Sequence, residues 1–431
     1  MFCFRVEGAK FLVCMRNPAG LAGRLFSTQP TGLPDPSCPE PNPVEKGIEE
    51  MVAKVGNLND LGILAVQFRN ADIGRLGVVH AIVRMARLTM AATHRPDIRS
   101  EEGRHVDRET MEILEHAALR HAPTFDARQV LDVLWGLSMM VRRESTVLVG
   151  ALAARAVAVA PHMNHQEVPG TLGSLKNLRF GLDRHVRHAA AIQIAARAMH
   201  PDVCSNLTPA GVAMTLQGLS AMSRSGDAAA VEALIRRASQ MAPQFSAEEV
   251  AQALGGCSEF DRSPATSTRW SEAAQPLLVH AATLATAFPP NAAVSTLRSL
   301  AKLGWVRTAA AEQRRHDHHT DGKQAASTLC AGLITVIPVA SLEGSRVSEA
   351  VWALAKMRVC AHGAVVGKEL GKRAAETYEK MSFKDVASAI WGLTVLGQRP
   401  SKELLTKMVW GLRDESATTP QTLTNFLWVG S

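Results

Sequence analysis

Seven arginines recur at similar positions relative to a repeated apolar pattern, and the arginine side chain is well suited to binding phosphate. Each lies four to seven residues beyond the last member of a repeated apolar triplet. A guanidinium can hold two phosphate oxygens at once, so a line of such residues predicts a nucleic-acid backbone site. A cation just past a helix also complements the helix dipole, and the sequence leaves both interpretations open. The arginines are Arg142, Arg179, Arg224, Arg262, Arg307, Arg358 and Arg399.

A second cluster that could do chemistry is "RRHDHH", which contains His316, Asp317, His318 and His319. Metal ligands in catalytic zinc sites usually converge from a rigid frame, and adjacent residues on a polar loop rarely do. We therefore interpret this segment as a solvated loop. Phosphate-binding Gly-rich loops, nucleophile elbows and paired catalytic carboxylates are also missing from the sequence. The prediction is that the chain is not an enzyme and uses no catalytic residue, metal or cofactor.

Apolar triplets with the spacing i, i+4, i+7 define the elements that must position the arginines. This spacing puts three side chains on one face of an α-helix. Most triplets start roughly 38–44 residues apart, with one interval of 54, and such recurrence is typical of helical repeats. The triplets are Val130/Leu134/Leu137, Val168/Leu172/Leu175, Val212/Leu216/Leu219, Val250/Leu254/Cys257, Ala293/Leu297/Leu300, Val347/Val351/Leu354 and Val386/Ile390/Leu393.

Ala-rich stretches between the triplets supply a second helix for each unit, at 145–160, 228–242, 273–287 and 364–381. The segments "APTF", "APQF" and "AFPPN" place a Pro next to a polar residue that could cap the following helix. We therefore expect an all-α fold, an α-solenoid of antiparallel helix pairs over residues 45–431. It should contain fifteen to eighteen helices and no sheet.

Two neighbouring positions inside the apolar phrase are occupied in a regular way. Trp135, Trp352 and Trp391 share the first position, where we expect them to pack between repeats. Truncation of Trp391 to Ala should therefore cost about 3–5 kcal/mol, as for a buried large aromatic side chain. The next position holds small residues, which should let adjacent helices approach closely. They are Gly136, Gly218, Gly256, Ala353 and Gly392.

The phrases "VLWGLSMM" (133–140), "AVWALAKM" (350–357) and "AIWGLTVL" (389–396) share a Trp, a small residue and a Leu. This pattern resembles the octotricopeptide and heptatricopeptide repeats of organellar RNA-binding proteins. It is also similar to the helical repeats of mitochondrial RNA-editing mediator proteins. The resemblance covers roughly residues 70–431 and implies a helical array that binds organellar RNA.

The N-terminal residues have the composition of a targeting sequence. Residues 1–26 hold Arg5, Lys10, Arg16 and Arg24 against one acid, as in a mitochondrial presequence cleaved after Phe26; a plastid-type organelle is the main alternative. Residues 27–44 are Pro-rich and should form a linker.

The seven cysteines make no C-x-x-C pair, which fits a reducing compartment. No apolar run is long enough to span a membrane.

Three classes of function follow from these patterns. The first is a non-catalytic RNA-binding protein of the mitochondrial matrix, acting in organellar RNA processing, stability or editing. The second is a structural subunit or assembly factor of the mitochondrial ribosome. The third is a protein-binding scaffold. Expected partners are organellar mRNA or rRNA and mitoribosomal or RNA-processing proteins, and the net charge of +7 permits an anionic partner.

Overall fold

The structure is a computed structural model that describes most of the chain from residue 43 onward and a short N-terminal part. The described residues are 2–6, 9–13, 43–68, 74–93, 101–140, 145–223, 228–260, 269–270, 272–306, 320–358 and 363–411. From residue 43 to 411 they form helices and connecting turns without a strand. Nineteen α-helices lie in this part, one more than the upper expectation, because the short α10 (Pro201–Cys204) interrupts one connection.

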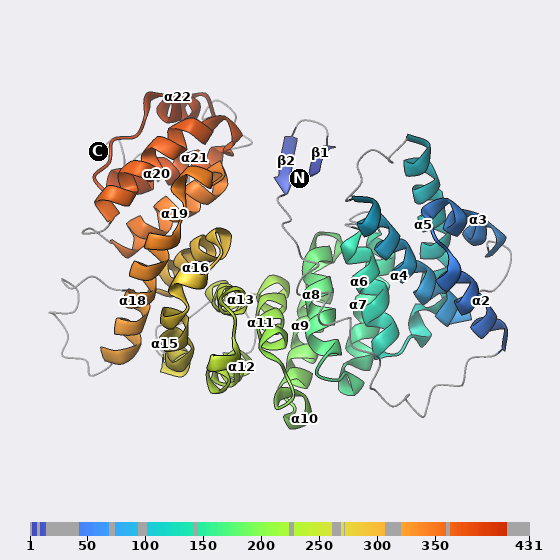
Figure 1. Cartoon of the computed structure of the whole chain (residues 1–431). Helices are drawn as coiled ribbons and strands as arrows, with labels where there is room; N and C mark the ends of the chain where they lie inside the picture. The colour runs from blue at the N-terminus through green and yellow to red at the C-terminus, as the bar shows by residue number, and fades with distance from the viewer. Residues whose placement is uncertain are drawn as a thin grey trace.

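The helices that carry the apolar triplets pack one against the next, and we call them the A row (Figure 1). Together with an upstream member, α4, the row follows the order of the chain, and α2 (Pro43–Lys54) packs against its first helix. The A row consists of α4 (Gly74–Thr93), α6 (Ala127–Met139), α8 (Glu167–Leu178), α11 (Pro209–Met222), α13 (Ala247–Ser258), α16 (Pro290–Leu303), α19 (Gly344–Met357) and α21 (Phe383–Val395).

The intervening helices form the B row. They pack neighbour to neighbour from α3 to α18, and α20 packs against α22. Figure 1 shows the two rows following an arc, with the earliest and the latest helices at its two ends. The B row consists of α3 (Leu58–Phe68), α5 (Glu101–His121), α7 (Thr146–Val159), α9 (Arg184–Ala198), α12 (Ala228–Gln240), α15 (Gln275–Thr283), α18 (Thr320–Val336), α20 (Gly363–Thr377) and α22 (Lys402–Gly411).

The apolar triplets form the core, as predicted. Every member of the seven triplets is at most 4% exposed, and Val130, Leu134 and Leu137 are fully buried. One hairpin cannot cover such a face by itself, so the neighbouring helices complete its burial. The helix-face prediction made from spacing alone is therefore confirmed for the described residues.

The small residues of the second position hold the A-row helices close together. A Cβ atom added at Gly218 would lie 2.5 Å from the Leu172 Cβ on the preceding helix. One added at Gly256 would lie 2.7 Å from the backbone of Leu216 and Gln217, and one at Gly392 would lie 2.6 Å from Val351 Cγ1. Real Cβ atoms do not approach this closely, so the expectation of a close helix approach at these positions is confirmed.

The tryptophans of the first position are less buried than we expected. Trp135, Trp352 and Trp391 are only half-buried. The buried tryptophans are Trp270, 1% exposed, and Trp305, 4% exposed, and neither belongs to the repeated phrase. The prediction of full burial is therefore not met, although Trp352 still packs against the core.

The turn before many A-row helices repeats the same local structure. A short 3₁₀ turn such as Ala122–Thr124 is followed by a buried residue, Phe125, and then by the helix N-cap, Asp126. Asp126, Ser246 and Ser382 each form a capping box with the residue three positions later, as their sequence setting favours. In "AFPPN" the N-cap is instead Pro289, so Asn291 lies inside α16 and does not cap it.

A basic side chain on the B helix closes most of these hairpins. Arg155 Nε, near the end of α7, donates to the carbonyl of Phe125, just before α6, at 2.6 Å. The end of one helix therefore lies beside the start of the other, which makes the pair antiparallel. The equivalent bonds join Arg197 to Met163, Arg237 to Leu207, His280 to Phe245, Arg373 to Leu342 and Lys407 to Met381, at 2.7–3.5 Å.

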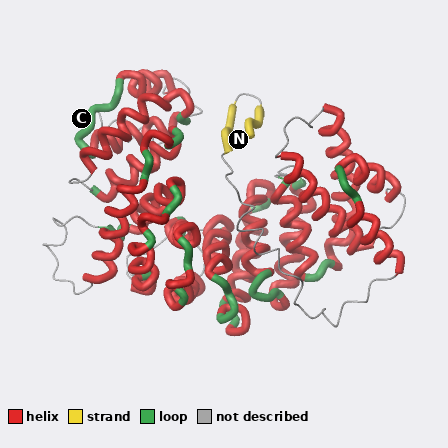
Figure 2. Tube along the Cα trace, in the orientation of Figure 1, coloured by secondary structure: helices red, strands yellow, loops and turns green. Residues whose placement is uncertain are grey.

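A two-stranded antiparallel hairpin, β1 (Phe2–Val6) and β2 (Ala9–Val13), precedes the helices (Figure 2). Phe2 pairs with Val13 and Val6 with Ala9. This hairpin was not predicted from the sequence. Aromatic and β-branched residues favour extended backbone, which accounts for it.

Candidate functional site

A groove runs along four consecutive A-row helices in the described part of the molecule. It has a volume of about 1050 Å³ and runs past α8, α11, α13 and α16, with the first turn of α9 as one wall. Its lining comes mainly from the C-terminal halves of α8, α11 and α13 and from the middle of α16. We call it the central groove.

In the helices along the central groove, the position that holds Trp elsewhere carries other residues, including Gly173 in α8 and Arg298 in α16. That position is Trp135 in α6, Trp352 in α19 and Trp391 in α21, but Gln217 in α11 and Gly255 in α13. A Cβ added at Gly255 would meet only Gln217 Nε2 at 3.9 Å and Ser299 Oγ at 4.0 Å. Space is therefore available here without any change to the helix packing.

The walls of the central groove are strongly basic. Five Lys or Arg side chains line it, together with His185 and His188, against the single carboxylate of Glu259. The cations are Lys176, Arg179, Arg184, Arg187 and Arg298. Because charges of one sign in a hollow focus the field, an anionic ligand would be drawn to this groove.

Two of these cations are held in place by neighbouring groups. Lys176 Nζ donates to Gln217 Oε1 at 2.7 Å, which links α8 to α11 across the groove. Burial lowers the pKa of Lys176, and the nearby charge of Arg179 lowers it further. Arg179 Nη1 donates to the Lys176 carbonyl at 2.8 Å, and its guanidinium carbon lies 4.4 Å from the centre of the Phe180 ring. These contacts therefore fix Lys176 and Arg179 close together in the basic wall of the groove.

Glu259 acts as an internal counter-ion at the other wall. Its Oε1 lies 3.3 Å from Arg298 and 2.6 Å from Lys302 on α16. Arg298 also lies 4.0 Å from Glu349 on α19, which in turn lies 2.6 Å from Arg346. This network spans three A-row helices. These side chains are partly exposed, so the ion pairs contribute little to stability and can exchange partners.

The seven predicted arginines are only partly placed by the structure. Arg179 lines the central groove. Arg358 and Arg399 are exposed after α19 and α21, and Arg358 has a left-handed backbone (φ 51°) with its N–H on the last carbonyls of α19. Arg358 thus lies at a helix end, as the dipole interpretation requires. The others, Arg142, Arg224, Arg262 and Arg307, lie outside the described residues.

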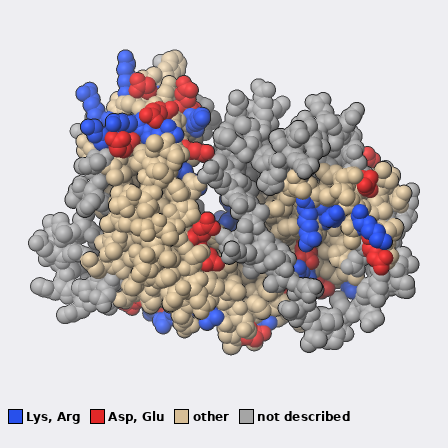
Figure 3. All heavy atoms as spheres, viewed as in Figure 1, with Lys and Arg blue, Asp and Glu red and all other residues tan. Residues whose placement is uncertain are grey.

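Sequence reasoning missed most of the residues that line the central groove. Arg184 and Arg187 belong to the basic run "RHVRH" at the start of α9, a signal that was visible in the sequence. Arg298 occupies the position directly after the second triplet member, where other helices carry Trp, and Lys176 directly follows a third triplet member, Leu175. Figure 3 shows further Lys and Arg over the C-terminal helices, interleaved with Asp and Glu. Some of these are paired, such as Lys372 with Glu369 at 3.0 Å, which reduces their attraction for an anion.

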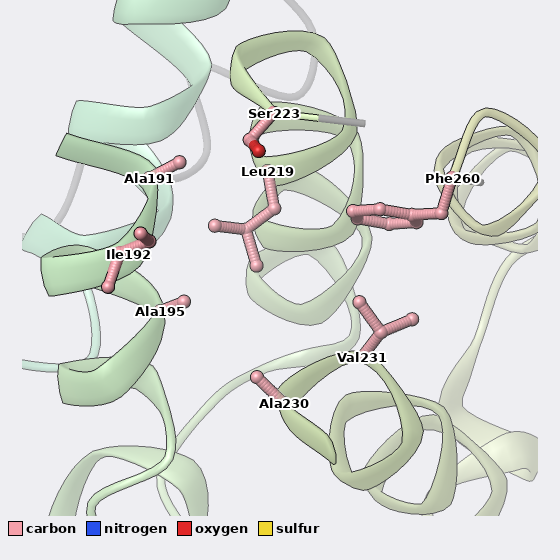
Figure 4. Close-up of a pocket in the computed structure, with 8 residues that line it drawn as sticks. All are labelled: Ala191, Ile192, Ala195, Leu219, Ser223, Ala230, Val231 and Phe260. Carbon is pink, nitrogen blue, oxygen red and sulfur yellow. The ribbon is translucent and has the colours of Figure 1, made fainter. Parts of the chain in front are cut away.

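A second hollow, between α9, α11 and α12, is a packing gap. Apolar side chains from these helices surround it, including Ile192, Leu219 and Val231, with Ser223 and Phe260 beside them (Figure 4). Its volume of about 10 Å³ is room for at most one water. It therefore offers no ligand site.

The described residues could also offer metal-binding groups or reactive thiols. They contain no group of three or more His, Cys, Asp or Glu side chains able to hold a metal, and residues 316–319 lie outside them. Cys257 and Cys330 are buried and form no disulfide, and burial raises the pKa of Cys330 to about 12, so Cys330 stays protonated at neutral pH.

None of the described helices combines the length and apolar character needed to cross a membrane. No protein-family model matches the chain, and no curated protein matches it significantly in sequence.

Proposed function

We propose that the protein is a non-catalytic α-solenoid that binds RNA in the mitochondrial matrix and acts in organellar RNA processing, stability or editing. The observation that carries the proposal is the central groove, with its five Lys or Arg side chains and one acid. The repeated hairpins packed in two rows support the solenoid, because each hairpin buries its apolar face only against its neighbours. The sequence resemblance to organellar RNA-binding repeats points the same way.

The groove would bind RNA mainly through its phosphates. Lys176, Arg184 and Arg187 offer charged donors from one wall, and Arg298 offers a guanidinium from the other. A phosphate arriving at Arg298 competes with the Glu259 carboxylate. Such contacts give affinity that falls with salt and carries little information about base sequence. The exposed Arg358 and Arg399 would extend the same edge toward the C-terminus.

The test is the salt dependence of RNA binding by the full chain. Changing Lys176, Arg184 and Arg187 together to Gln should flatten the slope of log K against log salt by about 0.7 per lost contact on single-stranded RNA, or about 2 in all. The matched control changes Lys54, Arg108 and Lys372 to Gln. These are exposed cations outside the groove lining with 61–80% side-chain exposure, and they carry the same total charge. Equal slopes in the two triple variants would overturn the groove as the binding surface.

The predicted arginine ladder is tested separately. Changing Arg224, Arg262 and Arg307 to Gln should weaken binding to many RNAs alike, because phosphate contacts are not specific for sequence. An unchanged affinity would restrict the site to the central groove and leave these arginines as charges at helix ends.

Sedimentation distinguishes the proposed role from the two alternatives. A small particle that disappears after ribonuclease treatment supports an RNA-processing role. Co-migration with mitochondrial ribosomes indicates a ribosomal subunit or assembly factor, and indifference to ribonuclease indicates a protein scaffold. Peptide mapping of the organelle-purified protein tests import, since residues 1–26 should be absent from the mature chain.

A further inference from the structure

Phe180 is an exposed large hydrophobic residue next in sequence to the lining of the central groove. Its exposed fraction is 68%, and it follows Arg179, which lines the groove. Both residues belong to a single 3₁₀ turn, Arg179–Gly181, between α8 and α9. Leu178 and Leu182 on either side of that turn are buried, at 3% and 7% exposure. The turn is thus anchored at both ends while Phe180 points its ring outward.

The residues around Phe180 indicate what type of ligand would contact its ring. The Arg179 guanidinium lies over the ring at 4.4 Å, a cation–π contact that orients both groups. Arg184 and Arg187 begin only a few residues later on the groove wall. Positive charge beside an exposed aromatic ring is the combination that binds single-stranded nucleic acid, with phosphates on the cations and a base stacked on the ring.

We propose that Phe180 stacks on one unpaired base of the RNA whose phosphates occupy the central groove. The inference rests on the proposed function, and it adds a preference for single strands. In a duplex the bases are stacked on one another inside the helix, so they are not available to a ring on the protein surface. The alternative occupant, an apolar side chain of a partner protein, would give no such discrimination between single and double strands.

The experiment compares three probes on the full chain. These are a single-stranded oligoribonucleotide, the same strand annealed to its complement, and inorganic polyphosphate, which has the charge but no base. Phe180→Ala should weaken binding of the single strand about 5- to 150-fold, the range for loss of one stacked base. The affinity for polyphosphate should stay within about twofold of that of the unmodified chain, because no phosphate contact is removed. The slope of log K against log salt should stay unchanged for the same reason. Phe180→Tyr should retain most of the affinity, since it keeps the ring.

Trp410→Ala provides the matched control. Trp410 is a comparably exposed aromatic residue, at 63%, on α22 at the far end of the helical array (Figure 1). Its removal should leave all three probes unaffected. Equal binding of the single strand by Phe180→Ala and the unmodified chain would overturn the stacking proposal, as would an equal loss for RNA and polyphosphate. If the unmodified chain binds neither RNA nor polyphosphate, the proposed function itself fails.

Discussion

Three flanking helices of the A row differ from the two central ones at the position directly after the second triplet residue. At the flanks, in α6, α19 and α21, the position after the second triplet residue carries Trp. At the centre, α11 and α13 carry Gln217 and Gly255, and the central groove opens there. The helix contacts are similar in both regions, since Gly136, Gly256 and Gly392 all face the backbone or a side chain of the preceding A-row helix. A regular array can therefore open a local groove without altering its packing.

The comparison separates tryptophans that support the fold from those that shape its surface. Trp270→Ala should reduce the free energy of unfolding by about 3–5 kcal/mol, because the side chain is 1% exposed and packs edge-on against Phe260. Trp391→Ala should cost about 1–2 kcal/mol, since part of that ring is already in water. Urea unfolding of both variants measures the difference. Equal losses would mean that the flank tryptophans belong to the core after all.

The small residues that face the preceding helix should be more sensitive to substitution than the glycine in the groove. Gly256→Ala should destabilise the protein by about 1–3 kcal/mol, because the new Cβ meets backbone atoms that cannot rotate away. The adjacent Gly255→Ala is the control, and it should be neutral or stabilising by about 0.5–1 kcal/mol, as expected for an unobstructed helical site. If the two variants unfold alike, close approach is not what requires Gly256.

Gly255→Trp would place in α13 the Trp that the flanking helices α6, α19 and α21 carry at the equivalent position. The indole should enter the central groove and reduce RNA affinity by about tenfold or more, equivalent to about 1.4 kcal/mol. Gly255→Ala leaves the groove open and should bind normally. Filter binding at fixed salt, with circular dichroism to check helix content, measures both. Normal RNA binding by a folded Gly255→Trp variant would contradict the groove as the site.

The smallest expected effect concerns Glu259, the one acid of the groove. Glu259→Gln removes the counter-ion of Arg298 and Lys302, which should strengthen RNA binding about two- to fivefold, within the range of an exposed ion pair. Glu369→Gln, which frees only Lys372 on α20, is the control and should leave affinity unchanged. Weaker binding in Glu259→Gln would show that the acid positions the cations for RNA and does not compete with it.

The sequence was most informative about local structure. Triplet spacing identified the A-row helices, and the capping boxes at Asp126, Ser246 and Ser382 mark where three of them begin. These features depend on residues within one or two helical turns, so they can be read directly. The hairpin closures could not, because each joins residues about thirty positions apart, as Arg155 and Phe125 show. The N-terminal strands were also missed, since basic and apolar residues alternate there in a way that suggested a presequence.

For the candidate site, the sequence by itself determined that basic residues follow the A-row helices and that aromatic residues are scarce. The tertiary structure decided which basic residues share one hollow, bringing Lys176 on α8, Arg187 on α9 and Arg298 on α16 to a single groove. It also decided that Trp391 lies at an edge and Trp270 in the core. The physical reason is that helical spacing fixes the direction of a side chain relative to its own helix. Whether that direction meets a neighbour or open space depends on how the next helix packs.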